Sequence, residues 1–199
     1  MIHLNGDLLC AIDCETTGLK SGHHDIIQFS VLPLGFDLEP SKKHIPLDLK
    51  LKPRRPENID LDALAVTKKT LIQHLEHAID PYLAADLFDE WFNRLKLPIN
   101  KKIAPLAHNW PFDRDFIKDW LGPEHFEHYF SHRYRCTLAT ANFVNDRYDN
   151  NAMRAPFPQL ILKQLANFNG VEVEGFLQHD ALYDCMITAK VYKKMLTIL

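Results

Sequence analysis

One stretch near the start of the chain decides the fold: Leu8-Leu9-Cys10-Ala11-Ile12-Asp13-Cys14-Glu15-Thr16-Thr17-Gly18-Leu19. Its first five residues are apolar and predict a buried strand, which ends in two acids separated by one residue. Successive side chains of a strand point to opposite faces, so Asp13 and Glu15 project from one face, about 7 Å apart. Such a pair either shares a proton or binds a divalent cation. An exposed acidic turn is the alternative, and partners elsewhere in the chain must decide.

The composition predicts one globular domain over residues 1–199, with 46% hydrophobic and 25% charged residues. A formal net charge of −3 argues against an extended grip on duplex nucleic acid, which needs a strongly basic face. It leaves room for a site that holds a few nucleotides through a metal. Four cysteines without Cys-x-x-Cys pairing, no leader pattern and no apolar run of about 20 residues predict a cytoplasmic protein with reduced thiols and no membrane span.

The order of apolar segments predicts a mixed sheet covered by helices. Strands are expected in the opening stretch and at residues 26–36, 44–51, 103–107 and 135–140. The gaps between the first three strands are too short for helical crossovers, so these strands should form an antiparallel meander. Helices are expected at residues 67–78 with Thr67 as the N-cap, at 81–95, at 109–122 with Asn109 as the N-cap, after 140, at 159–168 and at 180–196.

Two later segments supply further acids and a histidine. Asp113 follows the apolar run 103–107 and sits in the first turn of a helix, where the helix dipole favours negative charge. Ligands of α/β proteins usually bind at such strand ends. Asp184 lies on a helix that should pack on the sheet, preceded by His179 and Asp180, and its carboxylate can reach a cation between Asp13 and Glu15. Asp180 is interpreted as a helix cap or a solvated residue rather than a fifth catalytic acid.

Three motifs in this chain resemble those of a known family. They are Asp13-x-Glu15-Thr16-Thr17-Gly18-Leu19, His108-Asn109-x-x-Phe112-Asp113 and His179-x-Ala181-Leu182-x-Asp184. They look like the exonuclease motifs of the DEDDh family, which includes the proofreading epsilon subunit of bacterial replicative polymerase, RNase T and oligoribonuclease. The motifs occur in the family order and extend over most of the chain. A weaker stretch, residues 63–67, resembles the family segment that lines the pocket for the terminal nucleotide.

The resemblance implies the RNase H-like α/β fold, a five-stranded mixed sheet with three antiparallel strands, then two parallel ones, and helices on both faces. It also implies 3′→5′ hydrolysis of nucleic acid ends with two divalent metal ions, Mg²⁺ or Mn²⁺, and release of nucleoside 5′-monophosphates. Physical reasoning agrees, because two cations can stabilise both the attacking and the leaving oxygen of a phosphodiester. Four carboxylates roughly neutralise two such ions.

The same resemblance implies a role for each site residue. The catalytic set is Asp13, Glu15, Asp113, His179 and Asp184. Its four acids would be the metal ligands, with Asp13 bridging both ions, and His179 would be the general base, since its unperturbed pKa is near neutrality. The terminal nucleotide would be bound by Thr16, Thr17, Gly18, Leu19, Val66, His108, Asn109 and Phe112. Trp110-Pro111 replaces the small residues usual after His-Asn and predicts a bulkier wall of that pocket.

The preferred polymer and the partners stay open. Single-stranded DNA or mismatched 3′ ends are favoured; trimming of RNA or oligoribonucleotides is the alternative, because recognition of the 2′-OH depends on pocket geometry. A proofreading subunit docked on a polymerase, or an inactive binding module, is a further alternative, although the intact motifs argue against inactivity.

Two surface segments also have open roles. Lys50, Lys52, Arg54 and Arg55 either protect an edge strand from aggregation or guide the substrate. Residues 147–158 are polar and Asn-rich, contain two prolines and predict a mobile loop.

Overall fold

A computed structural model describes residues 4–66, 70–175 and 179–198. Its centre is a five-stranded sheet with the strand order β3-β2-β1-β4-β5. The strands are β1 (Leu8–Thr16), β2 (Ile26–Pro33), β3 (Leu47–Lys50), β4 (Ile103–Ala107) and β5 (Arg135–Cys136). The first three strands are antiparallel, and β4 and β5 run parallel to β1. The predicted mixed sheet is therefore confirmed, with the acid-bearing strand in the middle.

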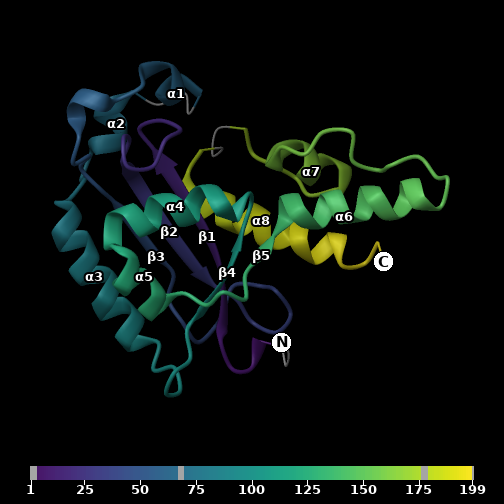
Figure 1. Cartoon of the computed structure of the whole chain (residues 1–199), viewed down its shortest axis with the longest axis horizontal. Helices are drawn as coiled ribbons and strands as arrows, with labels where there is room; N and C mark the ends of the chain where they lie inside the picture. Colours follow the sequence, from purple (N-terminus) through teal and green to yellow (C-terminus); the bar gives the residue numbers. More distant parts are fainter. Residues whose placement is uncertain (1–3, 67–69, 176–178, 199) are drawn as a thin grey trace.

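Helices cover both faces of this sheet (Figure 1). One face packs against α3 (Pro81–Arg94), α4 (Trp110–Leu121) and α5 (Pro123–Tyr129), through an aromatic core that includes Phe29, Phe88, Phe116 and Phe130. The other face packs against α6 (Thr137–Asn150), α7 (Leu162–Phe168) and α8 (Ala181–Met195). Short elements lie beyond the end of β1 that carries the acids: η2 (Pro56–Asn58), α1 (Leu61–Val66) and α2 (Leu71–Leu75).

The side chains of β1 alternate between the two cores. Cys10, Ile12 and Cys14 lie in the core formed with α3, α4 and α5, whereas Leu9 and Ala11 lie in the core formed with α8. Because the period of a strand is two, Asp13 and Glu15 belong to the α8 face. The acids thus continue the row of apolar residues on which α8 packs.

Several element boundaries differ from the prediction. The helix predicted from Thr67 begins after Thr70 instead, because Thr70 and Gln73 form a capping box; Thr67 lies outside the described residues. The predicted strand 44–51 is reduced to β3, and Ile45 is exposed. The predicted strand 135–140 ends at Cys136, where α6 begins. Helices α1 and α5 were not predicted.

The predicted loop 147–158 is partly helical. Helix α6 continues to Asn150 and so takes up the first residues of this segment. Near its other end, the side chain of Asn145 accepts a hydrogen bond from the backbone N–H of Phe157 and donates one to its carbonyl. Phe157 is buried in the core on the α8 side. The segment is therefore fastened to α6 at both ends.

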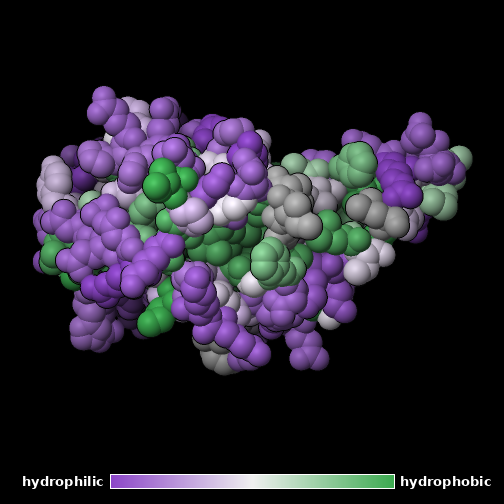
Figure 2. All heavy atoms as spheres, turned by 90° about the horizontal axis from the view of Figure 1, so that it is seen from below, coloured by the Kyte–Doolittle hydropathy of each residue, from purple (hydrophilic) through white to green (hydrophobic). Residues whose placement is uncertain are grey.

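The end of the molecule at which β1 begins has an apolar hollow. Figure 2 shows the molecule from below, with hydrophobic side chains in the middle of the view and hydrophilic ones around them. A cavity of about 440 Å³ where β1 begins is lined by Leu4, Leu8, Leu34 and Leu97, among others. Asp13 and Glu15 lie toward the other end of β1, so this hollow is separate from the predicted site. No helix in the described part of the chain has the length and apolarity needed to cross a membrane.

Candidate active site

The site begins with the two acids of β1. In the pairing of β1 with β2, Asp13 lies opposite Ser30 and Glu15 lies opposite Gln28. The pairing is irregular between Glu15 and Thr16, where the strand ends. Glu15 is buried and Asp13 is half-buried. Both carboxylates therefore project from the middle of the sheet toward the helix that packs on this face.

Helix α8 brings a third acid and a histidine to this point. Its N-cap is Asp180, whose side chain accepts a hydrogen bond from the Tyr183 N–H at 3.3 Å. The predicted cap role of Asp180 is thus confirmed. His179 precedes the cap with a φ of 62°, and its backbone N–H donates to Oδ2 of Asp184 at 3.3 Å. Glu15, His179 and Asp184 each offer one ligand atom, and these atoms lie within 4.8 Å of one another.

Helix α4 delivers a fourth acid from the opposite face of the sheet. Asn109 has a φ of 64° at the N-cap position, and its side chain makes no capping bond, so only its predicted position is correct. Asp113 follows in the first turn and is 2% exposed. Its Oδ1 accepts a hydrogen bond from the backbone N–H of Cys14 at 3.0 Å. Asp113 is therefore fastened to β1 between Asp13 and Glu15.

Burial raises the pKa of two of these acids, Asp13 and Asp113, and neighbouring carboxylates add to the rise at Asp13. Burial, followed by the carboxylates of Asp113, Glu15 and Asp184, raises the pKa of Asp13 well above its usual range. Burial also raises the pKa of Asp113 to about 8, although the hydrogen bond from Cys14 opposes the rise. Carboxylate oxygens are the ligands that Mg²⁺ and Mn²⁺ prefer. The donor set thus fits divalent cations, whose positive charge would offset the repulsion between the carboxylates.

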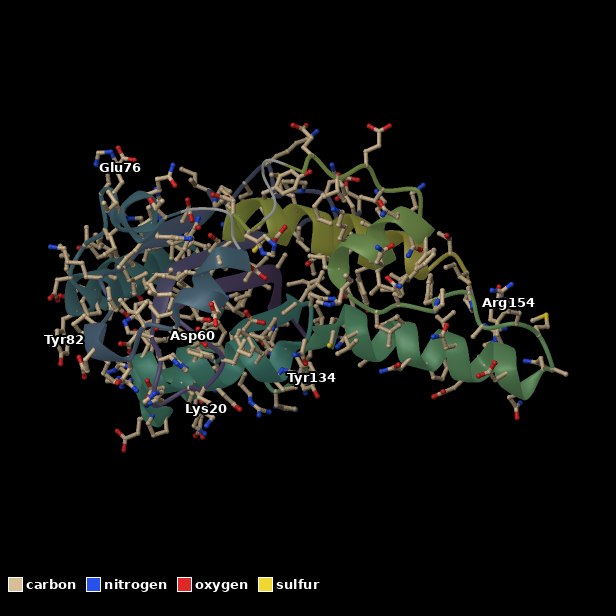
Figure 3. All side chains as sticks on the ribbon, turned by 90° about the horizontal axis from the view of Figure 1, so that it is seen from above. Lys20, Asp60, Glu76, Tyr82, Tyr134 and Arg154 are labelled. Atoms are coloured by element: carbon tan, nitrogen blue, oxygen red, sulfur yellow. The ribbon has the colours of Figure 1, made fainter. Side chains whose placement is uncertain are left out.

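The loop after β1 is held by its own hydrogen bonds. The Thr16 hydroxyl donates to the Gly18 carbonyl at 2.7 Å. Thr17 is buried, its hydroxyl accepts from the Asp25 N–H at 3.0 Å, and its own backbone N–H donates to the Asp25 carbonyl at 2.8 Å, so Thr17 fastens the loop. A Cβ on Gly18 would lie 2.5 Å from the His24 ring, which explains the glycine. Leu19 is 75% exposed, and Figure 3, which looks down on this end, labels Lys20 of the loop and Asp60, whose backbone N–H donates to the Thr17 carbonyl.

The other residues predicted to bind the nucleotide lie on three elements. His108 follows β4, its Nδ1 lies 2.8 Å from the Thr137 hydroxyl, and burial lowers its pKa to about 4. Asn109 is exposed, whereas Phe112 is half-buried against Phe116. Val66 ends α1, and its side chain lies outside the described set.

The prediction that Trp110 bulks up a wall of the nucleotide pocket is wrong. Trp110 is 2% exposed and packs in the aromatic core, with its ring centroid 6.3 Å from Phe126 and 6.2 Å from Phe130. The reason is the contact of Trp110 with another helix. Trp110 and Asp113 are both in the first turn of α4, but their side chains have different neighbours: Asp113 reaches Cys14, and Trp110 reaches α5.

The comparison with protein families agrees with these motifs. The model of the RNase T family, described as Exonuclease, matches residues 10–192. The chain belongs to the RNase T exonuclease family. The resemblance to DEDDh-type 3′→5′ exonucleases, and with it the prediction of a nuclease enzyme, is confirmed at the level of the family.

Solved structures share the fold of this exonuclease domain. Exonuclease I from Methylocaldum szegediense matches with a TM-score of 0.68 and 19% identity, over 94% of this chain and 40% of that one. E. coli exonuclease I in complex with a dA16 oligonucleotide matches with a TM-score of 0.71 and 18% identity, over 96% of this chain and 41% of that one. Cell-death related nuclease 4 (CRN-4) matches with a TM-score of 0.72 and 15% identity, over 96% of this chain and 64% of that one. The chain spans about two fifths of the exonuclease I chains. A search of curated proteins found no match.

A polar network on the α8 face of the exonuclease sheet was missed in the sequence. The Gln28 side-chain amide donates to Oδ1 of Asp48 at 2.9 Å and to Oδ2 of Asp180 at 3.4 Å. The Ser30 hydroxyl donates to the same Asp48 oxygen at 2.6 Å. Gln28 therefore ties the cap of α8 to β2 and β3. The sequence does contain a signal for this network, because Gln28 and Ser30 are polar residues two apart in an otherwise apolar strand and so share one face.

A second network holds the loop after β1 against helix α4. Asp25 is buried and accepts hydrogen bonds from Arg54 Nε at 3.2 Å and from the backbone N–H of Arg55 at 2.6 Å. Both arginines also pair with Asp119 of α4. Two members of the predicted basic cluster are thus engaged by acids of the protein itself, which assigns Arg54 and Arg55 a structural role.

Proposed function

We propose that this protein is a metal-dependent 3′→5′ exonuclease that acts on single-stranded DNA or frayed 3′ ends. It hydrolyses the terminal phosphodiester and releases a nucleoside 5′-monophosphate. Residues 1–199 act as a single exonuclease domain, and docking on a polymerase is not required for this activity.

The observation that carries the proposal is the meeting of four carboxylates and an imidazole at one end of β1. Glu15, His179 and Asp184 bring ligand atoms within 4.8 Å of one another. Asp113 contacts the backbone of Cys14, and its charge and that of Asp184 act on Asp13. Buried acids of one sign are costly without a cation, so the arrangement supports a catalytic metal centre more strongly than a structural role.

Asp13, Glu15, Asp113 and Asp184 are proposed to hold two Mg²⁺ or Mn²⁺ ions. Such ions, when bound, stabilise negative charge on the attacking and leaving oxygens and make water more acidic. The chain itself fixes where the acids are: the strand register sets Asp13 and Glu15, the Cys14 N–H sets Asp113, and the cap of α8 sets Asp184.

His179 is proposed to remove a proton from the attacking water. The water oxygen forms a new bond to the terminal phosphorus while the bond from phosphorus to the 3′ oxygen of the preceding nucleotide breaks. That 3′ oxygen takes up a proton from solvent, and His179 later returns its proton to solvent. The hydrogen bond from the His179 backbone to Asp184 keeps the imidazole beside the acids.

The exposed Leu19 and Asn109 are proposed to contact the terminal nucleotide. Gly18 and Thr17 keep the loop in place beneath it through the contacts with His24 and Asp25. DNA is favoured over RNA because exonuclease I of the same fold has been solved with DNA oligonucleotides. RNA trimming is the competing outcome of the experiment below.

The test offers 5′-labelled single-stranded DNA, duplex DNA, RNA and a dinucleotide side by side, with Mg²⁺ or Mn²⁺ and with a chelator. We expect metal-dependent shortening from the 3′ end, fastest for single-stranded DNA, with 5′-mononucleotides as products. Faster shortening of RNA would replace the DNA assignment by the RNA one. Degradation of none of these substrates by a folded, metal-loaded protein would refute the proposed function.

A further inference from the structure

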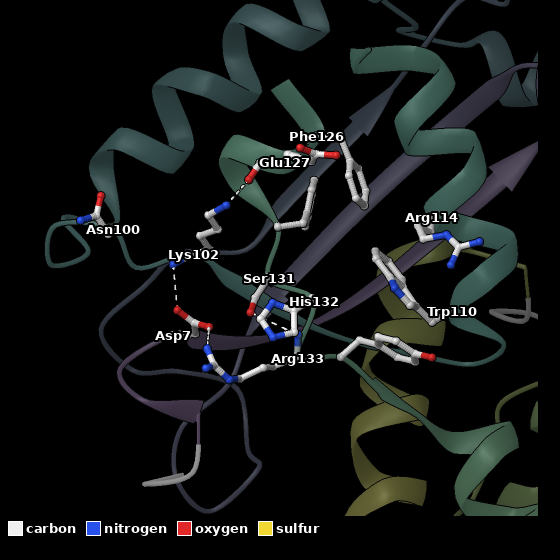
Figure 4. A pocket seen from close by; sticks show the side chains of 12 residues that line it. Asp7, Asn100, Lys102, Trp110, Arg114, Phe126, Glu127, Ser131, His132 and Arg133 are labelled. Carbon is white, nitrogen blue, oxygen red and sulfur yellow. Dashed lines mark hydrogen bonds and ion pairs between the residues drawn. The ribbon is translucent and has the colours of Figure 1, made fainter. Parts of the chain in front are cut away.

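A second cavity lies against helix α4 and extends toward the end at which β1 and β4 begin (Figure 4). Its volume is about 580 Å³. It lies between α4, α5 and the segment from Phe130 to Tyr134 that leads into β5. None of the residues predicted to be catalytic or to bind the terminal nucleotide lines it. The cavity therefore has no role in the site described above.

One part of this cavity is a wall of aromatic rings. Trp110 and Phe130 are buried and form its base, and Phe126 stacks on Trp110. Tyr134 lies 6.4 Å from Trp110, measured between ring centroids, and is 43% exposed. A large ring held by a buried cluster, with one side open to solvent, is a surface on which a planar base can stack.

The other part of the cavity is charged. Arg133 pairs with Asp7 at 3.5 Å, and Lys102 donates to the Glu127 carbonyl, so these cations are engaged inside the cavity. Arg114 differs, because its ion pair is with its exposed neighbour Asp115. Exposed ion pairs contribute little, and a phosphate can displace this one. Figure 4 places Arg114 next to Trp110, so a cation and a stacking surface occur together.

Helix α4 connects this cavity to the acids. Its first turn carries Asp113, which faces Cys14, and also Trp110, which forms the base of the cavity. Arg114 is the residue directly after Asp113. Tyr134 lies on the α4 side of the molecule when it is seen from above (Figure 3). A strand whose 3′ end lies at the acids can therefore reach the cavity by passing around the start of one helix.

We propose that this cavity binds an unpaired nucleotide of the substrate strand, on the 5′ side of the reacting end. Tyr134 stacks on its base, and Arg114 holds a phosphate. This inference rests on the proposed function and extends it, since it assigns part of the substrate affinity to a place outside the catalytic centre. It also supplies a reason for a single-stranded substrate, because stacking on Tyr134 needs a base that has left its duplex.

The kinetic experiment compares two substrates, a dinucleotide and a single strand of about twelve nucleotides, a length within the range that single-strand sites cover. The dinucleotide leaves a single nucleotide on the 5′ side of the reacting bond, whereas the longer strand extends well beyond it. In Tyr134→Ala, we expect KM for the longer strand to rise about tenfold relative to KM for the dinucleotide. Tyr134→Phe keeps the ring and should behave like the wild type. Arg114→Ala should weaken binding of the longer strand and lower its dependence on salt.

Matched controls come from helix α3. Tyr82 is an exposed tyrosine and Arg94 an exposed arginine paired with Glu90, and neither lines the cavity. Tyr82→Ala and Arg94→Ala should leave both substrates unaffected. Thermal unfolding of every variant shows whether the aromatic cluster around Trp110 is still intact.

A binding experiment separates this inference from the proposed function. The anisotropy of a fluorescent single strand is measured with Asp13→Asn as the background, with and without Tyr134→Ala. Weaker binding in the double variant supports the cavity site even if the protein hydrolyses nothing. Equal binding with and without Tyr134→Ala, or an equal change of KM for both substrates, overturns it. In that case a peptide segment of a protein partner becomes the better candidate for the cavity.

Discussion

Helices α4 and α8 both deliver an acid to the end of β1, but they do so in different ways. Asp113 of α4 is buried and bonded to the backbone of Cys14, while the N-cap of its helix makes no side-chain capping bond. Asp184 of α8 is half-exposed, and its helix is capped by Asp180, which Gln28 ties to the sheet. Asp113 is positioned by the backbone of β1. Asp184 is positioned by its helix, which the side chains of Asp180 and Gln28 connect to the sheet.

The difference teaches where this site is rigid and where it can adjust. The donor to Asp113 is a backbone N–H of the central strand, which stays in place as long as the sheet is formed. Asp184 and His179 depend on side-chain hydrogen bonds, each worth about 0.5–1.5 kcal/mol. Substitutions near α8 should therefore change catalysis without unfolding the protein. Substitutions near α4 should change stability as well.

The largest effect is expected at Asp13, because the charges of both helices act on it. Asp13→Ala should lower the rate of mononucleotide release by about 1000-fold or more, since several kcal/mol of charge stabilisation are lost. The rate is measured with Mg²⁺ and with Mn²⁺, and circular dichroism serves as the control for folding. Undiminished release would rule out the metal assignment.

His179→Ala tests the α8 side alone. It should slow turnover about 100-fold or more, the usual contribution of a general base, and should leave metal binding measured by calorimetry nearly unchanged. His125→Ala, an exposed histidine of α5, is the control. Loss of metal binding would instead identify His179 as a ligand.

Asp113→Asn tests the α4 side through stability. An aspartate ionises near pH 4 in an unfolded chain, whereas burial raises the pKa of Asp113 to about 8 in the metal-free fold. The stability that its proton contributes is complete below about pH 4 and is lost as the pH rises to about 8. The metal-free variant should therefore unfold at a temperature several degrees above that of the wild type at pH 8, with a smaller difference at pH 5. Equal differences at both pH values would contradict this.

The smallest effect is expected at Gln28. Gln28→Leu removes the tie between the cap of α8 and the sheet, and kcat should fall about tenfold while the melting temperature changes little. Combined with Asp180→Ala, the effect should be less than additive, because both changes break one network. Gln159→Leu, at an exposed glutamine, is the control. Fully additive effects would show that Gln28 acts elsewhere.

Much of this fold could be predicted because its signals are local. The run from Ile103 to Ala107 became β4 with the expected bounds, and the acids of the motifs met at the end of β1. Where two local signals competed, the prediction failed: Thr67 and Thr70 are both possible caps, and only the partner Gln73 distinguishes them. Ile45 fits the alternation of a strand, but the pairing of β3 starts at Leu47, so Ile45 stays exposed.

The rest of the site depends on contacts between distant segments. Gln28, Asp48 and Asp180 are far apart in the sequence, and only the packing of α8 on the sheet brings them together. The basic cluster at Arg54 and Arg55 showed no partner in the sequence, because Asp25 and Asp119 lie far from it along the chain. Trp110 was misassigned for the same reason, since its partner Phe126 comes from another helix.

The alternation along β1 has a consequence for how the chain folds. Asp13 and Glu15 lie on the α8 face because Leu9 and Ala11 do. A slip of one residue in the strand pairing would turn both acids into the aromatic core beneath α3, α4 and α5, where no cation could reach them. The acids needed for chemistry therefore also disfavour the wrong register, because a chain that mispairs β1 by one residue would have to bury two carboxylates in an apolar core.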